Sequence, residues 1–378
     1  MLEPDGVLGC RRTVWIGFAS RICVWAPTID KIGTGTERLS WIFISLASAG
    51  ETMKKAVTSV LSAFNLQPVL VDIGASGTPP RVWEPIARHS VYIGFDPDRR
   101  ELHDTPRGVY ARSIIVNQAV TTEPDQDEVH FYLTRCPYCS STLPPDTEAL
   151  ANYLFSDLFR VERETSVPAS SLNSVIHRLG FPGVDWFKTD SQGTDLRLFQ
   201  SLEDGVRNRV LAVDIEPGLI DAYRGEDLFV DAHRELLHQG FWLSSLDVKG
   251  AIRMRPPTLA TLFRDQPSLR EADIAQSIRS SPCWCEARYL RTIESLQARN
   301  AEEKDYALLW VFALLDGQSG FALDLAHEYH STFHKTDISD ILRELSVKAI
   351  QDCNNRPTWT RIKAFFPVSV KQFIKRLL

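Results

Sequence analysis

The stretch VLVDIGASGT, residues 69–78, joins an apolar run and an acid to a loop of small residues. A second apolar run, VYIGF at residues 91–95, ends in Asp96 about 20 positions after the loop. A buried strand, a tight turn and an acid closing the next strand are typical of a nucleotide-binding βαβ unit. The glycines let backbone N–H groups approach the ligand, and the later acid can hold both ribose hydroxyls. The sequence therefore predicts an α/β fold with a ligand at this turn.

Two details of the loop favour S-adenosylmethionine over a dinucleotide. The loop is not G-x-G-x-x-G, which disfavours an NAD-type dehydrogenase. Asp72 precedes the first glycine, where an acid faces cationic or hydrogen-bond-donating groups rather than a pyrophosphate. S-adenosylmethionine carries an amino group, a sulfonium and a ribose, and no phosphate. The alternative for this segment is a glycine-rich turn between two core strands.

Strand and helix patterns alternate from residue 69 to residue 248, which predicts a doubly wound sheet of mostly parallel strands. The Glu128–Thr134 segment alternates apolar and polar residues and predicts a half-exposed antiparallel strand. Further strands are expected near residues 91–95, 113–120, 184–189, 209–215 and 241–248, and helices after Thr78 and near residues 170–179, 196–202 and 229–238. The segment between residues 135 and 165 is expected to be a loop-rich insertion.

Four acids follow expected strands: Asp72, Asp96, Asp190 and Glu216. Ligands of open α/β sheets bind at the carboxyl ends of the strands. We therefore expect these four carboxylates to gather at one edge of the sheet and to mark the functional site.

Composition narrows the class of protein. The chain has 378 residues, 44% of them hydrophobic and 24% charged, which are ordinary globular values. A formal net charge of −6 argues against general affinity for nucleic acid. Seven cysteines, an odd number in a long chain, do not resemble a secreted disulfide framework, so a reducing cytoplasm is expected.

Five segments resemble, in order and spacing, the FkbM-type S-adenosylmethionine-dependent methyltransferases over roughly residues 66–248. They are VDIGASG at 71–77, GFDP at 94–97, NQAV at 117–120, WFKTDSQG at 186–193 and VDIEP at 213–217. The resemblance implies a class I methyltransferase fold, with a Rossmann-like, mostly parallel sheet that includes an antiparallel strand. It also implies O-methylation, often of sugars in glycans or polysaccharides.

The resemblance also implies the cofactor site. Asp72, Gly74 and Ser76 would contact the methionine part of S-adenosylmethionine, and Asp96 would hold the ribose. The expected cofactor residues are Asp72, Gly74, Ala75, Ser76, Gly77, Asp96, Pro97 and Asn117.

The chain departs from the family pattern at several positions. It has Ser76 where the family usually has Asn, and Thr78 where the family has a further glycine. Asp96 and Asp195 stand where Glu is common. The altered loop and the long C-terminal extension support an alternative to the enzyme, a non-catalytic binding or scaffolding protein with the same fold.

Methyl transfer from a sulfonium is an in-line displacement, in which the acceptor oxygen must lie about 3 Å from the methyl carbon. A sugar hydroxyl is a weak nucleophile, so a general base or a metal should assist. Asp190 is the first candidate base, with Lys188 close by to tune it, and Glu216 is the second. Gln192 is expected to bind substrate or adenine, and Lys188 is grouped with it as substrate-binding. The alternatives are a cofactor or structural role for Asp190, and a capping role for Glu216.

Two cysteine pairs suggest a separate hypothesis. Cys136 and Cys139, with Cys283 and Cys285, would supply the four thiolates of a tetrahedral zinc site, and a redox role is the other chemical option. Cys-x-Cys is an uncommon zinc pair, and the two pairs are far apart in sequence. We therefore expect small apolar cysteines and no metal, with S-adenosylmethionine as the cofactor.

The chain divides into three parts. Residues 1–52 contain only short apolar patches, below the roughly 20 residues of a membrane span, so no transmembrane segment is predicted. We expect this part to be poorly ordered or untranslated, because Met53 opens an amphipathic helix leading into the first strand. Residues 53–250 are expected to form the methyltransferase domain and residues 257–378 a helical C-terminal region.

The last residues, 361–378, combine basic side chains with an apolar stripe and contain no acid. We expect this segment to dock on its own domain, with peripheral contact to a membrane surface as the alternative. The remaining partner is the acceptor itself, a glycan or small molecule.

Overall fold

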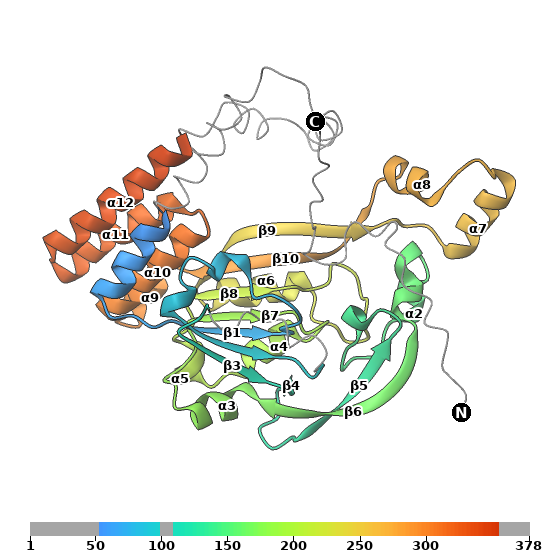
Figure 1. Ribbon diagram of the computed structural model, residues 1–378, viewed down its shortest axis with the longest axis horizontal. Coiled ribbons are helices and arrows are strands. Elements are labelled where there is room, and N and C mark those ends of the chain that lie inside the picture. Colours follow the sequence, from blue (N-terminus) through green and yellow to red (C-terminus); the bar gives the residue numbers. More distant parts are fainter. Residues whose placement is uncertain (1–52, 99–108, 355–378) are drawn as a thin grey trace.

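The structure, a computed structural model, describes residues 53–98 and 109–354. A seven-stranded sheet forms the centre, and a three-stranded sheet curves past the ends of the central strands (Figure 1). The strands are β1 (Val69–Ile73), β2 (Val91–Phe95), β3 (Arg112–Val116), β4 (Ala119–Thr121), β5 (Glu128–Thr134), β6 (Val161–Ser171), β7 (Trp186–Thr189), β8 (Ala212–Ile215), β9 (Phe241–Ala251) and β10 (Ser281–Arg291).

Helices cover both faces of the central sheet. A helix at residues 53–63 precedes β1. The others are α2 (Thr147–Leu150), α3 (Leu172–Leu179), α4 (Asp195–Gln200), α5 (Asp204–Arg207), α6 (Phe229–His238), α7 (Pro256–Asp265), α8 (Glu271–Ser277), α9 (Ile293–Ala298), α10 (Glu303–Leu315), α11 (Ser319–Phe333) and α12 (Thr336–Asn354). Short 3₁₀ turns are η1 (Arg81–Trp83), η2 (Ala87–His89), η4 (Pro137–Cys139) and η5 (Leu154–Phe159).

The central strands have the order β3-β2-β1-β7-β8-β10-β9. The five strands from β3 to β8 are parallel, and β10 is antiparallel to both β8 and β9. The predicted fold class is confirmed: a mostly parallel, doubly wound sheet with an antiparallel strand and C-terminal helices. The chain leaves β1 towards β2 on one side and reaches β7 on the other, so β1 and β7 flank the switch point where such folds bind ligands.

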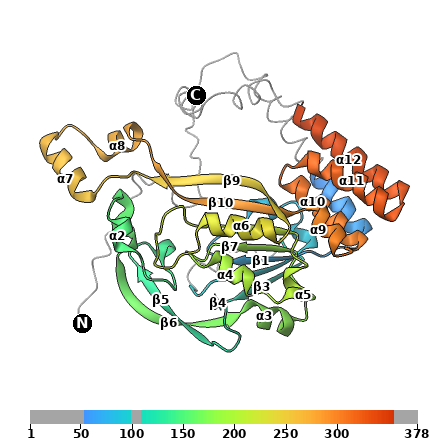
Figure 2. The same ribbon diagram turned by 180° about the vertical axis from the view of Figure 1, so that it is seen from behind.

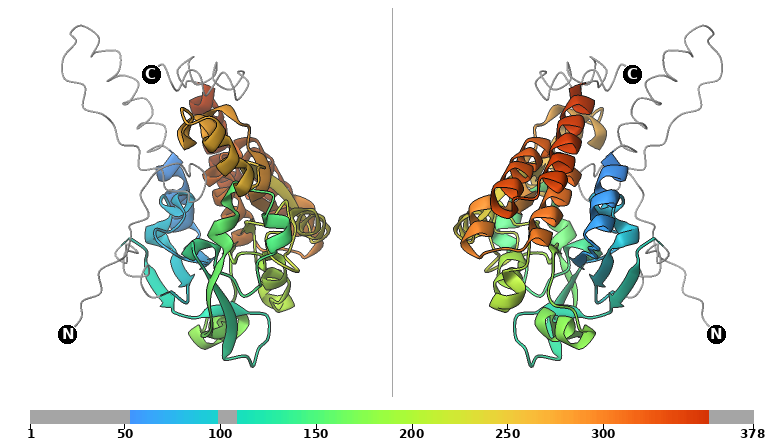
Figure 3. Two further views of the ribbon diagram at one scale, coloured as in Figure 1. Left: turned by 90° about the vertical axis from the view of Figure 1, so that its right-hand side faces the viewer. Right: turned by 90° about the vertical axis from the view of Figure 1, so that its left-hand side faces the viewer.

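Alternation within β1 assigns the two faces of the sheet. Val69, Val71 and Ile73 belong to a core with α3, α4 and α6, whereas Leu70 belongs to a core with residues 53–63, α10 and α11. Figure 3 shows the helix of residues 53–63, in blue, beside the orange and red C-terminal helices. Because both faces are covered, all five residues of β1 are buried.

The helix expected after Thr78 is replaced by the two 3₁₀ turns η1 and η2. Pro79 and Pro80 supply no N–H at its start, and Pro85 removes the N–H that a continuing helix would use. The segment therefore crosses from β1 to β2 in short turns, with Trp83 buried against the sheet.

The strand expected at residues 113–120 divides in two. β3 continues the central sheet, and β4 pairs with β6 in the small sheet. The break falls at Asn117 and Gln118, where the chain changes sheets. The expected antiparallel strand Glu128–Thr134 is present as β5. Its partner β6 was not expected, because most of its residues are exposed and show no apolar period.

Strand β10 lies within residues 257–378, where we expected a helical region. Its buried side chains alternate along the strand, at Cys283, Cys285, Ala287 and Tyr289. Pro282 and the charged residues between them obscure this period in the sequence. β9 and β10 form a long hairpin with α7 and α8 at its far end (Figure 2).

Two predictions lie outside the described residues, those for residues 1–52 and for residues 361–378. Among the described residues, no helix is long and apolar enough to cross a membrane.

Candidate functional site

Two cavities meet at the carboxyl edge of the central sheet. The first has a volume of about 770 Å³ and lies between the ends of β1 and β2 and the small sheet. The second, of about 860 Å³, lies over the ends of β1, β7, β8 and β10. Five residues line both: Gly74, Ser76, Tyr138, Asp190 and Gln192. The two cavities have the volumes of small-molecule sites. A reaction between two ligands would take place where the cavities join.

The turn after β1 requires glycine at Gly74. Its φ is +77°, and its N–H donates to the carbonyl of Phe95 at 2.9 Å. A Cβ at this position would overlap the backbone oxygen of Asp190. The loops after β1 and β7 therefore cross in contact, which places Asp190 beside the turn.

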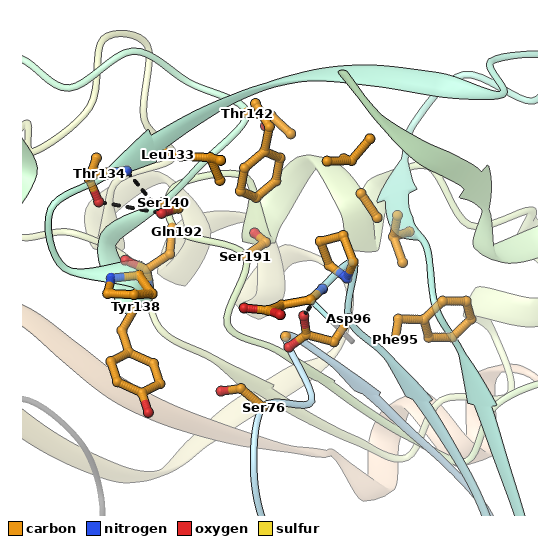
Figure 4. A pocket seen from close by; sticks show the side chains of 18 of the residues that line it. Ser76, Phe95, Asp96, Leu133, Thr134, Tyr138, Ser140, Thr142, Ser191 and Gln192 are labelled. Atoms are coloured by element: carbon orange, nitrogen blue, oxygen red, sulfur yellow. Dashed lines mark hydrogen bonds between the residues drawn. The ribbon is translucent and has the colours of Figure 1, made fainter. Parts of the chain in front are cut away.

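Asp96 is the main acid of the first cavity (Figure 4). It is 7% exposed, and its Oδ1 accepts the N–H of Asp98 at 2.7 Å. Asn117 does not line the cavity; its Nδ2 donates to the carbonyl of Asp96 at 2.7 Å. Pro97 lines the cavity, as does Gln118, which the sequence analysis did not single out. Asn117 thus holds the strand end that carries the acid.

Ala75 and Gly77 line neither cavity. Ala75 is buried and its N–H donates to the carbonyl of Phe95 at 2.9 Å, while Gly77 has a φ of +84°. Both shape the turn, and Ser76 between them faces the junction of the cavities.

The loop after β7 is held by side chains from distant segments. Gln192, at a φ of +59°, donates from Nε2 to Oδ1 of Asp190 at 2.6 Å. Its backbone carbonyl accepts Oγ of Ser141 at 2.7 Å, and its Oε1 lies 2.9 Å from the hydroxyl of Tyr223. A non-glycine residue in this conformation is strained, and these contacts hold it there.

Asp195 holds the same loop through hydrogen bonds to its backbone and side chains. It is fully buried and its Oδ1 accepts Oγ1 of Thr189, the N–H of Ser191 and Oγ of Ser191 at 2.7–2.9 Å. Its Oδ2 accepts the N–H of Glu216 at 3.3 Å. Burial raises the pKa of Asp195 to about 6, although the bonds from Ser191 act in the opposite direction. One side chain therefore joins the ends of β7 and β8.

A row of alternating charges crosses the sheet beneath the second cavity. The strand register aligns Asp72, Lys188, Asp214 and Arg288 side by side on β1, β7, β8 and β10. Nζ of Lys188 lies 2.6 Å from Asp72, and Nε of Arg288 lies 2.7 Å from Asp214. Burial alone would lower the pKa of Lys188, but Asp72 and Asp190 raise it above its ordinary value.

Asp72 thus lines the second cavity rather than the first. It is 3% exposed and also accepts the hydroxyl of Tyr92 at 3.0 Å. Lys188, predicted as substrate-binding, is its ion-pair partner.

Glu216 lines the second cavity near Asp190. Burial raises its pKa well above the ordinary value, and the charges of Asp190 and Glu286 raise it further. Glu226, from the loop before α6, also lines this cavity, and burial raises its pKa to about 7. The lining of the second cavity therefore includes two carboxyl groups, Glu216 and Glu226, that retain their protons more strongly than usual.

The four cysteines of the zinc hypothesis do not all lie in one cluster. Cys139 and Cys283 share a small core cluster with Cys136 at its margin, while Cys285 lies in the core beneath the sheet. All four are free thiols. Within residues 53–98 and 109–354, no group of three or more His, Cys, Asp or Glu side chains is arranged to hold a metal ion.

Several residues of the candidate site were not predicted from the sequence, among them Tyr138, Tyr223 and Glu226. Tyr138 and Tyr223 come from the insertion and from the loop after β8, and only folding brings them to Gln192. Ser191 lines the first cavity and belongs to the motif at residues 186–193. Its position in that motif could have identified it as a site residue.

The site fits S-adenosylmethionine. Asp96 would hold the ribose hydroxyls, and Phe95, Val120 and Leu133 provide apolar walls for an adenine ring. Asp72, which lines the second cavity and is paired with Lys188, would contact the amino group of the methionine part. When bound, the cofactor would supply an electrophilic methyl group on a sulfonium.

Comparison with known proteins found one family match. Residues 77–243 match the family model described as the methyltransferase FkbM domain. No curated protein and no solved structure matched the chain. The matched segment runs from the turn after β1 to the start of β9 and includes Asp96, Asp190 and Glu216. Residues 77–243 of the chain are therefore similar to the FkbM methyltransferase domain, and this domain implies an S-adenosylmethionine-dependent methyltransferase.

Proposed function

We propose that the enzyme methylates a hydroxyl group of a carbohydrate, in a glycan or polysaccharide, with Asp190 as the general base. One observation carries the assignment of the base. Among the carboxylates of the described residues, Asp190 alone lines both cavities. A base must lie within hydrogen-bond reach of the acceptor hydroxyl while that hydroxyl faces the methyl group.

The lining of the second cavity supports a polyhydroxylated acceptor. Besides Asp72, Asp190 and Asp214, this cavity is lined by Glu216, Glu226, Asp247 and Glu286. The carboxyl oxygens of these side chains can accept hydrogen bonds from hydroxyl groups, and a protonated carboxyl group can also donate one. Tyr138 and Trp284 add aromatic surface at its wall, and Tyr138 is 49% exposed. Carboxylates and aromatic rings together match the polar edges and apolar faces of a sugar.

In this mechanism the acceptor hydroxyl gives its proton to the carboxylate of Asp190 as its oxygen forms the bond to the methyl carbon. Gln192 holds Asp190 in place through the 2.6 Å hydrogen bond. Glu216, whose raised pKa favours the protonated form, donates a hydrogen bond to a neighbouring acceptor oxygen. Lys188 keeps Asp72 paired beneath the reacting groups.

The test is methyl transfer from radiolabelled S-adenosylmethionine to a panel of mono-, oligo- and polysaccharides, with proteins and phenolic compounds as non-carbohydrate acceptors. Asp190→Asn should lower kcat by roughly 10²- to 10⁴-fold, the usual worth of a general base. It should leave the affinity for the demethylated cofactor within about threefold, because the oxygen of the new amide can still accept the hydrogen bond from Gln192.

Asp221→Asn is the matched control, because Asp221 is exposed and lines neither cavity. Full activity of Asp190→Asn would remove the base assignment. Transfer to the non-carbohydrate acceptors alone would overturn the carbohydrate assignment.

We also propose that the enzyme works in the cytoplasm. The four free thiols within the described part of the chain support a reducing compartment. Localisation of the tagged full-length chain by cell fractionation would test this.

A further inference from the structure

The turn between β5 and the insertion brings two cysteines together beside the methyl-transfer site. Cys136 immediately precedes the 3₁₀ turn η4 and Cys139 is its last residue, and the N–H of Cys139 donates to the carbonyl of Cys136 at 2.8 Å. Such an i to i+3 bond holds the two Cα atoms less than about 7 Å apart. Disulfides commonly span about 4.4–6.8 Å between Cα atoms, so the turn is compatible with one.

The two thiols differ in their exposure to solvent. Cys136 is half-buried, whereas Cys139 is fully buried beneath it. Cys139 hydrogen-bonds to Cys136, which lowers the pKa of the Cys136 thiol to about 7, and the same bond raises the pKa of Cys139. A reachable sulfur with thiolate character and a buried partner are the two parts needed for disulfide exchange.

The pair contacts the site through its backbone and its neighbours. The hydroxyl of Tyr223 lies 2.9 Å from the carbonyl of Cys139 and 2.9 Å from Oε1 of Gln192, so its single proton is shared between them. Gln192 in turn holds Asp190. Tyr138, between the two cysteines in the sequence, lines both cavities, as does Gln192 (Figure 4).

We propose that Cys136 and Cys139 form a reversible dithiol–disulfide site whose oxidation by a small-molecule disulfide weakens the methyl-transfer site. The control of methyl transfer rests on the proposed function, whereas disulfide formation itself does not.

The exchange proceeds in two steps. The Cys136 thiol loses its proton and attacks one sulfur of the small-molecule disulfide, which releases one thiol and leaves a mixed disulfide on Cys136. The Cys139 thiol then loses its proton and attacks the Cys136 sulfur, which releases the second small-molecule thiol. The two cysteines lose two electrons and two protons, and the small-molecule disulfide accepts both.

Ring closure acts on the site because it shortens the distance between the sulfurs from a hydrogen-bond contact to about 2.05 Å. The movement displaces Cys139, its carbonyl and Tyr138. The shared proton of Tyr223 and the position of Gln192 then change, and Asp190 loses part of its support.

The experiment equilibrates the full-length protein in glutathione buffers of increasing disulfide fraction and maps its cysteines by mass spectrometry after alkylation. We expect a Cys136–Cys139 disulfide that disappears on return to reduced glutathione. In the same samples, calorimetry should show roughly fivefold weaker binding of the demethylated cofactor after oxidation, about the effect of one hydrogen bond.

Three variants make the assignment specific. Cys139→Ser should accumulate a stable mixed disulfide on Cys136, and Cys136→Ser should form neither a disulfide nor a mixed disulfide at Cys139. Cys283→Ser, which removes a buried thiol of the same cluster, should still form the Cys136–Cys139 bond.

A pair that stays reduced in oxidised glutathione would overturn the proposal, as would a Cys139–Cys283 disulfide in its place. A disulfide without any change in cofactor affinity would overturn the control of the site. None of these outcomes depends on which acceptor the enzyme methylates, so failure of the carbohydrate assignment is read separately.

Discussion

The crossing of two loops at Gly74 is the tightest packing constraint at the junction of the cavities. A side chain there meets the backbone of Asp190, which cannot rotate away as a flexible side chain could. The positive φ of Gly74 adds a conformational cost for any other residue. The absence of a Cβ at Gly74 thus allows the proposed base, Asp190, to lie against the turn after β1.

Gly74→Ala should therefore weaken binding of the demethylated cofactor by at least about tenfold and lower Tm by several degrees, because the loops must separate. Calorimetry and thermal unfolding measure the two effects. Gly205→Ala is the matched control, because a Cβ at Gly205 meets nothing within 4 Å and alanine favours the helix α5. Equal affinities for the two variants would contradict the crossing.

Glu226 makes stability depend on pH in a defined direction. Burial raises its pKa from 4.5 to about 7, so the folded chain holds this proton more tightly than the unfolded chain. Its contribution to stability is fully present below pH 4.5 and is lost as the pH rises through about 7. Above that pH the carboxylate is charged and poorly solvated.

Glu226→Gln should therefore stabilise the protein at pH 8, on the order of 1–2 kcal/mol, and give no gain near pH 4.5. Glutamine keeps an oxygen to accept the N–H groups of Ala222 and Tyr223. Denaturant unfolding at the two pH values measures the difference. The exposed Glu123→Gln is the control, and a gain for Glu226→Gln that is equal at both pH values would exclude the titration.

The acids of the candidate site could be proposed from the sequence because they follow strands and lie in motifs. Asp96 and Asp190 both line cavities, and their roles stay predictions. Asp72, at the neighbouring strand end, faces the other side of the sheet and pairs with Lys188. Tyr223 was not identified, since its contact with Gln192 depends on how the insertion folds back. Sequence motifs thus locate strand ends, whereas contacts between loops require the structure.

At the scale of elements, α4 is joined to two strands through its first residue. Asp195 receives donors from the end of β7, from the following loop and from the end of β8. Asp195→Ala would leave these buried donors unsatisfied and should cost about 2–4 kcal/mol of unfolding free energy. Urea denaturation measures the loss.

Asp204→Ala provides the comparison, because Asp204 is the first residue of α5 but its side chain is 84% exposed. Its ion pair with Arg207 should contribute less than about 1 kcal/mol. Similar losses for the two variants would show that Asp195 acts only as an ordinary first-turn acid.

Elements with a clear apolar period were predictable, and elements set by tertiary pairing were not. β1, β2, β7 and β8 are short runs buried on both faces, and their composition alone indicates them. β10 carries Pro282 and charged residues, and it becomes a strand because β8 and β9 offer edges on both sides. The helix predicted after Thr78 was wrong because the interruption at Pro85 was not weighed.

At the scale of the whole molecule, the C-terminal helices share a core with the sheet. α10 is buried around its whole circumference from Tyr306 to Leu314, so it has no solvent face of its own. Arg288 of β10 bonds Asp214 on β8 and Asp316 just after α10, at 2.7 and 2.8 Å. The residues before and after the expected boundary near residue 256 therefore share one continuous core.

This shared core predicts that the catalytic sheet and the helical region unfold together. Trp310 on α10 is fully buried and its Nε1 donates to Oγ of Ser346 on α12 at 2.9 Å. Trp310→Ala should cost about 3–5 kcal/mol. It should also shift the urea midpoint for loss of cofactor binding as far as the midpoint for loss of helix, because removing the packing of α10 weakens the sheet beneath it.

Ile341→Ala on α12 is the control, since Ile341 is 54% exposed and should move neither midpoint by more than about 0.5 kcal/mol. Two separate transitions, with cofactor binding persisting after the helices of Trp310→Ala have unfolded, would show that the helical region folds independently. Coincident transitions would mean that a change on α10 reaches the methyl-transfer site through stability alone, because α10 lines neither cavity.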